Sequence, residues 1–188
     1  MAPSIDDPRL LSPQCLSLKP VKTLHQNPWF TVRDRGGFYS VEYNEPQLAV
    51  LPVVDRQWVV MVRVRRPLIA DSTLELPAGG VIGNESGAEA AKRELAEETG
   101  IAIEDLDRFK ELKPLSVTPR FPCLVHTFQV NLSGREYDSR GDHDHEVTSV
   151  ELFSLAEIAK KMVSGEIYLC LPLGVLARFM IEKSERPL

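Results

Sequence analysis

The hydrophobic pattern divides the chain into strand-like and helix-like segments. Residues 48–54 and 58–64 are rich in aliphatic side chains and flank the polar turn 55–57, which predicts two long strands. The same pattern predicts further strands at 29–34, 38–43, 110–117, 123–131 and 147–153, with a short extended piece at 74–77.

Capping signals at both ends define a helix over residues 87–99. Ser86 is a good N-cap, Glu89 completes a capping box, and Gly100 stands where a helix end favours a left-handed residue. Strands, one early helix, more strands and two final helices indicate an α/β fold. The remaining expectations are a helix capped by Ser154 and Glu157 and ending at Gly165, a last helix at roughly 171–183, and a long polar loop at 132–145.

The N-terminal part of the sequence has a different character. Residues 1–14 are rich in Pro, Ser and Asp and are expected to lack regular structure. Short strands follow, and Gly36–Gly37 separates two of them like a hairpin turn. Residues 44–46 break the pattern. We therefore expect a tail and β arm at 1–45 and a main domain at 46–188.

Composition limits the class of protein. The 188 residues suit one domain with a short appendage, and a net charge of −5 argues against a nucleic-acid polymer as partner. No apolar run is long enough to cross a bilayer, and the start of the sequence shows no secretory signal. Cys15, Cys123 and Cys170 are odd in number and widely spaced, as free thiols in a reducing compartment would be. These features predict a cytoplasmic protein with no membrane partner.

Three glutamates near the end of the 87–99 helix break the rules of helix stability. Glu94, Glu97 and Glu98 share an arc of roughly 100° on one face. Glu94 and Glu98 form a like-charge pair that costs about 0.2–0.5 kcal/mol. Anions in the last turn cost about 0.3–1 kcal/mol each. Rules broken together indicate a site, and a hard divalent cation would reverse the sign of these costs. The ordinary alternative is a solvated glutamate-rich face.

The surroundings favour the cation. An apolar strip on the same helix borders the acids, and the segment 77–80 before the helix contains Gly79 and Gly80, which let backbone approach a ligand closely. Its carbonyl oxygens could complete a cation's shell. The apolar strip consists of Ala88, Ala91 and Leu95.

This segment resembles the Nudix box of the Nudix hydrolases. The box has nine fixed positions across 23 residues, and a match at this spacing is far more specific than a lone glycine motif. Every fixed position is filled, by Gly79, Glu85, Arg93, Glu94, Leu95, Glu97, Glu98, Gly100 and Ile101.

The resemblance implies an αβα sandwich around a mixed β-sheet, with an N-terminal β-strand arm. It implies Mg²⁺-dependent hydrolysis of a nucleoside diphosphate linked to a further group, with Mn²⁺ as a substitute. By position, Glu94, Glu97 and Glu98 would bind the metal together with a carbonyl of Ala78 or Gly79. Arg93 and Glu85 would shape the loop and orient the glutamates, with Gly79 and Gly100 as structural positions, although Arg93 as a mere surface partner of Glu97 stays an alternative.

Residues upstream of the box are similar to those of the ADP-ribose pyrophosphatase and ADP-sugar group. Arg66–Pro67 and residues 75–79 match that group, in which Arg65 or Arg66 would contact substrate phosphates and Glu75 would join the substrate site. A solvated strand end is the plain alternative for either arginine. The resemblance covers roughly residues 48–183. More weakly, the N-terminal strands resemble an arm that exchanges between the subunits of a homodimer.

One departure leaves the substrate open. The group commonly has a proline about sixteen residues beyond the box next to glycine, whereas here Pro119 stands eighteen residues past Ile101 and no glycine adjoins it. We expect cleavage of ADP-ribose or another ADP-sugar into a nucleoside monophosphate and a sugar phosphate. A damaged nucleoside triphosphate or a coenzyme as substrate, or a non-catalytic nucleotide-sugar sensor, are the alternatives.

The general base is expected in the loop "GDHDHEV". Glu146 and Asp144 are the best candidates because each precedes the strand at 147, and Glu146 is favoured of the two. Glu97 is the alternative base within the box. His143 and His145 in this loop could form a separate metal site, and the ordinary alternative is that they are hydrated loop residues. Trp29 in the arm would stack on the nucleotide base or pack in the core.

Overall fold

A computed structural model describes residues 14–185, so the irregular structure expected for residues 1–13 lies outside the described part. Its centre is a seven-stranded sheet in which β4 and β9 run parallel and every other pair of neighbours is antiparallel. The sheet is therefore mixed, as predicted. Its path is β10 (Val147–Ser154), β5 (Trp58–Arg66), β4 (Gln47–Val54), β9 (Phe121–Leu132) and β8 (Lys110–Thr118), with β6 (Asp71–Glu75) on β5 and β7 (Ala78–Gly80) on β4.

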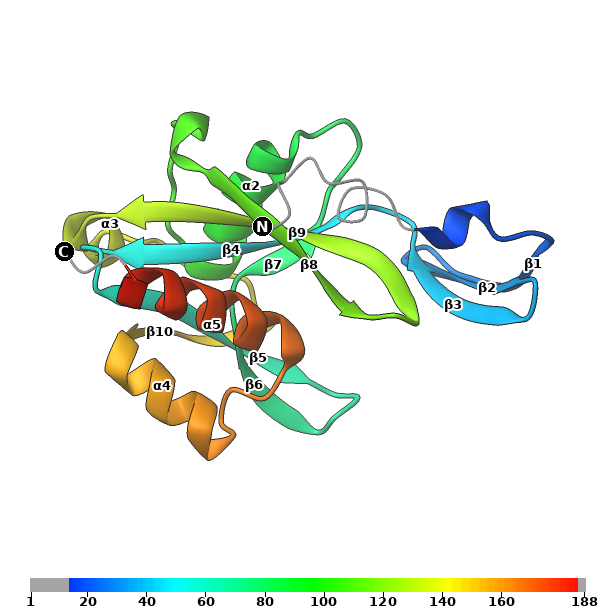
Figure 1. Ribbon diagram of the computed structural model, residues 1–188. Helices are drawn as coiled ribbons and strands as arrows, with labels where there is room; N and C mark the ends of the chain where they lie inside the picture. Colours follow the sequence, from blue (N-terminus) through cyan, green and yellow to red (C-terminus); the bar gives the residue numbers. More distant parts are fainter. Residues whose placement is uncertain (1–13, 186–188) are drawn as a thin grey trace.

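Helices cover both faces of this sheet (Figure 1). The helix α2 (Gly87–Thr99) packs on one face, and α4 (Leu155–Ser164) with α5 (Cys170–Glu185) packs on the other. Alternate side chains of β4 enter the two cores, because successive side chains of a strand point to opposite faces. The continuous apolar run at 48–54 follows from burial on both sides, and the αβα sandwich is confirmed.

The predicted caps are present. The Ser86 hydroxyl accepts from the Glu89 N–H, and Gly100 closes α2 in the left-handed region at φ 71°. The same arrangement begins α4 at Ser154 and ends it at Gly165. None of the described helices combines the length and the apolarity needed to span a bilayer.

The expectation of a plain loop at 132–145 is wrong for part of that stretch. A short helix, α3 (Gly134–Asp138), begins at Ser133, and Glu136 completes its capping box. Arg108 from the short 3₁₀ turn η2 (Leu106–Arg108) binds the Glu136 carboxylate at 2.6 Å and ties the helix down. The Ser-x-x-Glu spacing was present in the sequence, but the ion pair that secures it comes from 28 residues away.

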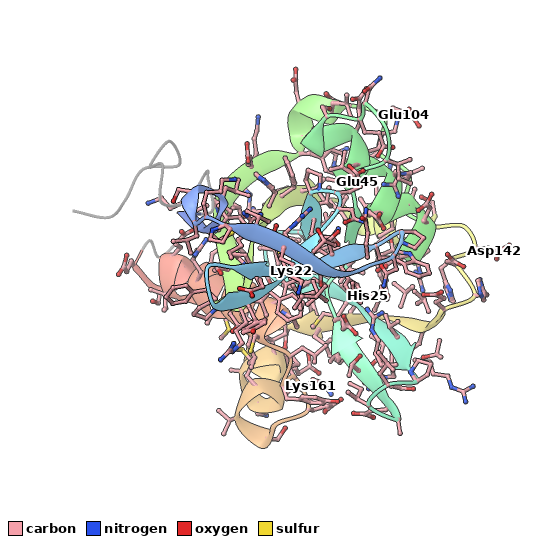
Figure 2. All side chains as sticks on the ribbon, turned by 90° about the vertical axis from the view of Figure 1, so that its right-hand side faces the viewer. Lys22, His25, Glu45, Glu104, Asp142 and Lys161 are labelled. Carbon is pink, nitrogen blue, oxygen red and sulfur yellow. The ribbon has the colours of Figure 1, made fainter. Side chains whose placement is uncertain are left out.

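The N-terminal arm is a separate three-stranded sheet that follows the 3₁₀ turn η1 (Gln14–Ser17). It projects from the side of the main sheet in Figure 1, and in Figure 2 it faces the viewer, with Lys22 and His25 on its nearest strand. The Val41 N–H donates to the Arg120 carbonyl and links the arm to the β8–β9 hairpin at 2.9 Å. The strands are β1 (Val21–Gln26), β2 (Phe30–Arg35) and β3 (Phe38–Tyr43).

Candidate active site

Glu94 is the buried member of the acid cluster. It leaves only 7% of its surface exposed. Its carboxylate lies directly against Gly79, where a Cβ atom would overlap it. Gly79 therefore lets the β7 backbone approach the acid face of α2 as no other residue would.

Arg93 connects the acids to the loop before α2. Its Nε and Nη2 donate to both oxygens of Glu85 at 2.9 and 3.1 Å, and Nη2 also donates to the Gly80 carbonyl at 2.7 Å. Its Nη1 donates to Glu94 at 2.7 Å and to Glu97 at 3.0 Å. These bonds, first of all those to Glu85, raise the pKa of the Arg93 guanidinium. Arg93 is thus more than a surface partner of Glu97.

Glu98 faces β7 beside Glu94. Burial, followed by the charge of Glu94, raises the pKa of Glu98 to about 8. The Ala78 N–H donates to its Oε2 at 3.4 Å. The Val50 N–H donates to the Pro77 carbonyl across the antiparallel β4–β7 pair. Residues along such a strand alternately face the partner strand and turn away from it, so the N–H and the carbonyl of Ala78 both point away from β4. The site therefore offers a crowded pair of carboxyl groups next to an outward-facing backbone carbonyl.

Arg66 approaches the acids from β5. Its Nε and Nη2 donate to the two oxygens of Glu75 at 2.7 and 3.0 Å. Hydrogen bonding to Glu75 raises the pKa of Arg66, and the charges of Glu98 and Glu146 act in the same direction. Neighbouring side chains alternate along a strand, so Arg65 points to the other face and is exposed. The structure separates two arginines that the sequence left equivalent.

The loop 139–146 docks on the C-terminal end of α2. The Gly141 N–H donates to the Gly100 carbonyl at 2.8 Å, and the Asp144 N–H donates to the Glu97 carbonyl at 2.7 Å. These bonds satisfy carbonyls that a helix end leaves without intrahelical partners. A Cβ on Gly100 would overlap the Gly141 carbonyl. The docking brings Glu146 into the electrostatic environment of Arg66.

The polar side chains of this loop divide into two kinds. The Asp144 carboxylate turns back on His145 and accepts from its backbone N–H at 2.5 Å. The side-chain bond with His145, followed by this backbone bond, lowers the pKa of Asp144. Glu146 is exposed, and its side chain does not share this arrangement. Of the two candidate bases in the loop, Asp144 is the one already engaged by a neighbour.

Within residues 14–185, no three His, Cys, Asp or Glu side chains converge on one point as a ready-made metal site. That applies to His143 and His145, and it applies equally to the box glutamates, of which two are drawn to Arg93. The chemistry of the donors still fits a hard divalent cation, because carboxylate and carbonyl oxygens are its preferred ligands. Burial and then the charge of Glu94 raise the pKa of Glu98, so a cation bound there would stabilise its ionised form.

Trp29 lies in the arm and is 72% exposed, which excludes core packing, one of the two alternatives given for it. Its N–H donates to the Asn27 side chain at 2.9 Å, and its carbonyl accepts from the Asn44 N–H at 3.0 Å. Both partners belong to the arm and its exit. Stacking of Trp29 on a nucleotide base stays a prediction.

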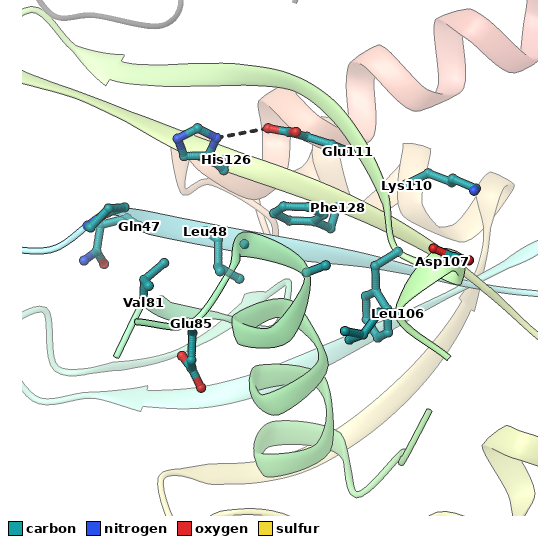
Figure 3. Close-up of a pocket in the computed structure, with 14 residues that line it drawn as sticks. Gln47, Leu48, Val81, Glu85, Leu106, Asp107, Lys110, Glu111, His126 and Phe128 are labelled. Atoms are coloured by element: carbon teal, nitrogen blue, oxygen red, sulfur yellow. Dashed lines mark hydrogen bonds and ion pairs between the residues drawn. The ribbon is translucent and has the colours of Figure 1, made fainter. Parts of the chain in front are cut away.

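A cleft of about 610 Å³ lies at the N-terminal end of α2, away from the acid cluster (Figure 3). It opens between the first turn of α2 and strands β8 and β9, where His126 contacts Glu111 at 3.2 Å. Of the residues that surround the acid cluster in the described part of the chain, Glu85 alone also lines this cleft. This cleft is therefore separate from the acid cluster, which lies at the C-terminal end of the helix.

Comparison with known proteins bears on this arrangement. The family model of the NUDIX domain matches residues 45–170, which include α2 and all seven strands of the main sheet. The chain belongs to the Nudix family. The polar residues at the box positions lie together between α2 and β7, where Arg93 contacts Glu85, Glu94 and Glu97. The apolar box residues Leu95 and Ile101 belong to the core.

Among curated proteins, the ADP-ribose pyrophosphatase of Bacillus subtilis (strain 168) is 32% identical to this Nudix chain over 123 residues, which is 64% of each protein. The match thus spans less than two thirds of that relative. Among solved structures, one titled crystal structure of ADP compounds hydrolase aligns with a TM-score of 0.63 at 20% identity, over 89% of this chain and 94% of that one. This second likeness supports the Nudix fold.

Sequence reasoning missed several residues that shape this Nudix site. Thr73 lies two positions before Glu75 on the same face of β6, and its hydroxyl donates to the Glu75 carboxylate. Gly141 and the backbone of Asp144 anchor the loop on α2. The period of two could have pointed to Thr73, whereas the docking contacts join segments distant in sequence.

Proposed function

We propose that the chain is a Mg²⁺-dependent hydrolase of the pyrophosphate bond in a nucleoside diphosphate sugar, ADP-ribose or another ADP-sugar. The products would be a nucleoside monophosphate and a sugar phosphate. The observation that carries the proposal is the pair Glu94 and Glu98, which share a confined place with the pKa of Glu98 raised to about 8. The printed name of the Bacillus subtilis relative supports the choice of substrate class.

Glu94, Glu97 and Glu98 would hold the metal, with the Ala78 carbonyl as a further oxygen ligand. When bound, Mg²⁺, or Mn²⁺ in its place, neutralises phosphate oxygens and lowers the pKa of water. Arg93 keeps Glu94 and Glu97 on the same side of α2 through Nη1. Glu85 and the Gly80 carbonyl orient Arg93 in turn, so the loop before α2 sets the position of the ligands.

Arg66 would bind the substrate phosphates. Glu75 occupies the Nε edge of its guanidinium and leaves Nη1 without a hydrogen-bond partner among the described residues. A guanidinium held on one edge presents the rest of its fork to a phosphate in a fixed direction. Arg65, on the other face of β5, is the less suited of the two arginines. Trp29 would stack on the base only if the arm reaches the substrate.

Glu146 would act as the general base that takes a proton from the attacking water. It follows the loop that docks on α2, and its charge acts on Arg66. Asp144 is less suited because its carboxylate binds His145. Glu97 is less suited because Arg93 holds it. A general base must reach the reacting water within hydrogen-bond distance, and the Glu146 carboxylate has no hydrogen-bond partner within residues 14–185.

A substrate panel tests the proposed activity. Purified protein with Mg²⁺ is offered ADP-ribose, other nucleoside diphosphate sugars, a coenzyme and oxidised nucleoside triphosphates, and released nucleoside monophosphate is measured. We expect ADP-sugars to be hydrolysed fastest. Hydrolysis of triphosphates alone would contradict the substrate class, and binding of a nucleotide sugar with no turnover would indicate a sensor instead.

We further propose a cytoplasmic homodimer in which the 1–45 segment acts as an exchanging arm. The arm carries exposed apolar side chains that a partner subunit would cover. They include Leu24, Trp29, Phe38 and Tyr39. Light scattering that returns the mass of one 21.1 kDa chain at working concentrations would contradict the dimer.

A further inference from the structure

Thr73 is a buried residue to which the proposed function assigns no role. Only 1% of its surface is exposed, and it lies on β6 two positions before Glu75. Its hydroxyl donates to Glu75 Oε1, while its longer contact, to the Val64 carbonyl, is 3.4 Å. One hydroxyl hydrogen serves one strong bond, and the carboxylate is the nearer and charged acceptor.

Glu75 passes this constraint to Arg66. The same oxygen, Oε1, accepts from Thr73 and from the Arg66 Nε at 2.7 Å, while Oε2 accepts from Nη2 at 3.0 Å. A carboxylate can rotate about its terminal bond, and that torsion has broad wells. The Thr73 bond therefore fixes the rotation that the two Arg66 bonds require.

The strand register supports the connection. Thr73 stands opposite Val64 in the β5–β6 ladder, and Asp71 stands opposite Arg66. Thr73, Glu75 and Arg66 therefore project from one face of the hairpin toward α2. Arg66 is the longest of the three, and 42% of its side chain is exposed. A long side chain with that exposure has many rotamers, so support from a buried neighbour helps to keep it in one direction.

We propose that Thr73 is a positioning residue, which orients Glu75 so that Arg66 presents its free guanidinium edge to a substrate phosphate. This inference rests on the proposed function for its last step only. The first step, from Thr73 through Glu75 to Arg66, concerns the protein alone.

Thr127 offers a matched control. It is also 1% exposed and lies in a strand of the same sheet, but its hydroxyl has no hydrogen-bond partner among the described residues. Thr→Val keeps the shape of the side chain and removes the hydroxyl at either position. A general effect of losing a buried hydroxyl would appear in both variants, and an effect on Arg66 would appear in Thr73→Val only.

The first measurement is independent of turnover. The Arg66 Nε–H resonance, assigned by its loss in Arg66→Lys, reports the bond to Glu75. We expect protection from solvent exchange in the wild type and Thr127→Val, at least about tenfold faster exchange in Thr73→Val, and recovery in Thr73→Ser. Unchanged exchange in Thr73→Val would overturn the positioning role.

The second measurement is a double-mutant cycle on the best substrate of the panel. Thr73→Val should lower kcat/KM about tenfold in the wild type and have little effect in the Arg66→Gln background, with Thr127→Val neutral in both. An equal loss in both backgrounds would overturn the link to Arg66. If no panel substrate is hydrolysed, the proposed function and the phosphate step fail, while the exchange measurement still decides the first step.

Discussion

Glu98 is a carboxyl group that this fold holds against its ordinary tendency to ionise. Burial and the neighbouring Glu94 raise its pKa to about 8, and the Arg66 charge only partly offsets them. A carboxylate that destabilises the fold when it is ionised is typical of a functional site, where a bound cation can compensate its negative charge. By contrast, Glu85, in the loop before α2, accepts hydrogen bonds from the Arg93 guanidinium, and these bonds lower its pKa. The same motif therefore contains acids of opposite character.

This difference predicts a pH-dependent stability. A carboxyl whose folded pKa lies above its ordinary value of 4.5 stabilises the fold fully below pH 4.5, and that contribution is lost as the pH rises through about 8. Without divalent cations, Glu98→Gln should raise the free energy of unfolding by about 1–2 kcal/mol at pH 9 and by much less at pH 5. Urea unfolding at both values measures this, with Glu104→Gln, an exposed acid, as the control. Equal effects at the two pH values would show that ionisation is not the cause.

At the scale of elements, α2 and the loop 139–146 form one unit. The last carbonyls of the helix receive the loop, and Gly100 makes the contact close enough. The capping box and the final glycine of α2 follow directly from the sequence. The loop contact does not, because it joins Gly100 to Gly141 across a strand hairpin. Arg65 and Arg66 illustrate a similar limit, since the direction of a side chain depends on how the hairpin pairs.

Gly165 provides a control for Gly100, because it ends α4 at φ 79° and no described residue lies close to where its Cβ would be. Gly165→Ala should cost about 1 kcal/mol from backbone strain and leave turnover unchanged. Gly100→Ala adds a clash with Gly141, so we expect at least about 1 kcal/mol more and a loss of turnover as the loop with Glu146 shifts. Thermal unfolding and steady-state rates of the two variants decide the matter. Identical behaviour would mean that the loop does not depend on this contact.

At the scale of the whole molecule, the sandwich was predictable and the detailed site was less so. The strands at 48–54 and 58–64 and the helix at 87–99 are strongly patterned, and the structure contains them within one or two residues. The acids follow from the box spacing. The family resemblance also named Arg66, Glu75 and Ala78, but not their contacts, because these residues come from three different strands. The three strands of the arm form a small sheet of their own. How the arm would pack on a second subunit does not follow from the sequence, because the packing depends on the surface of that partner.

The proposed activity depends on a divalent cation bound at the C-terminal end of α2. Calorimetric titration of Mg²⁺ into the wild type, Glu98→Gln and Glu104→Gln at pH 7.5 tests it most directly. We predict binding with proton release in the wild type and Glu104→Gln, and an affinity at least about tenfold lower in Glu98→Gln. Binding of equal strength in all three proteins, or none in the wild type, would contradict the metal site and the function built on it.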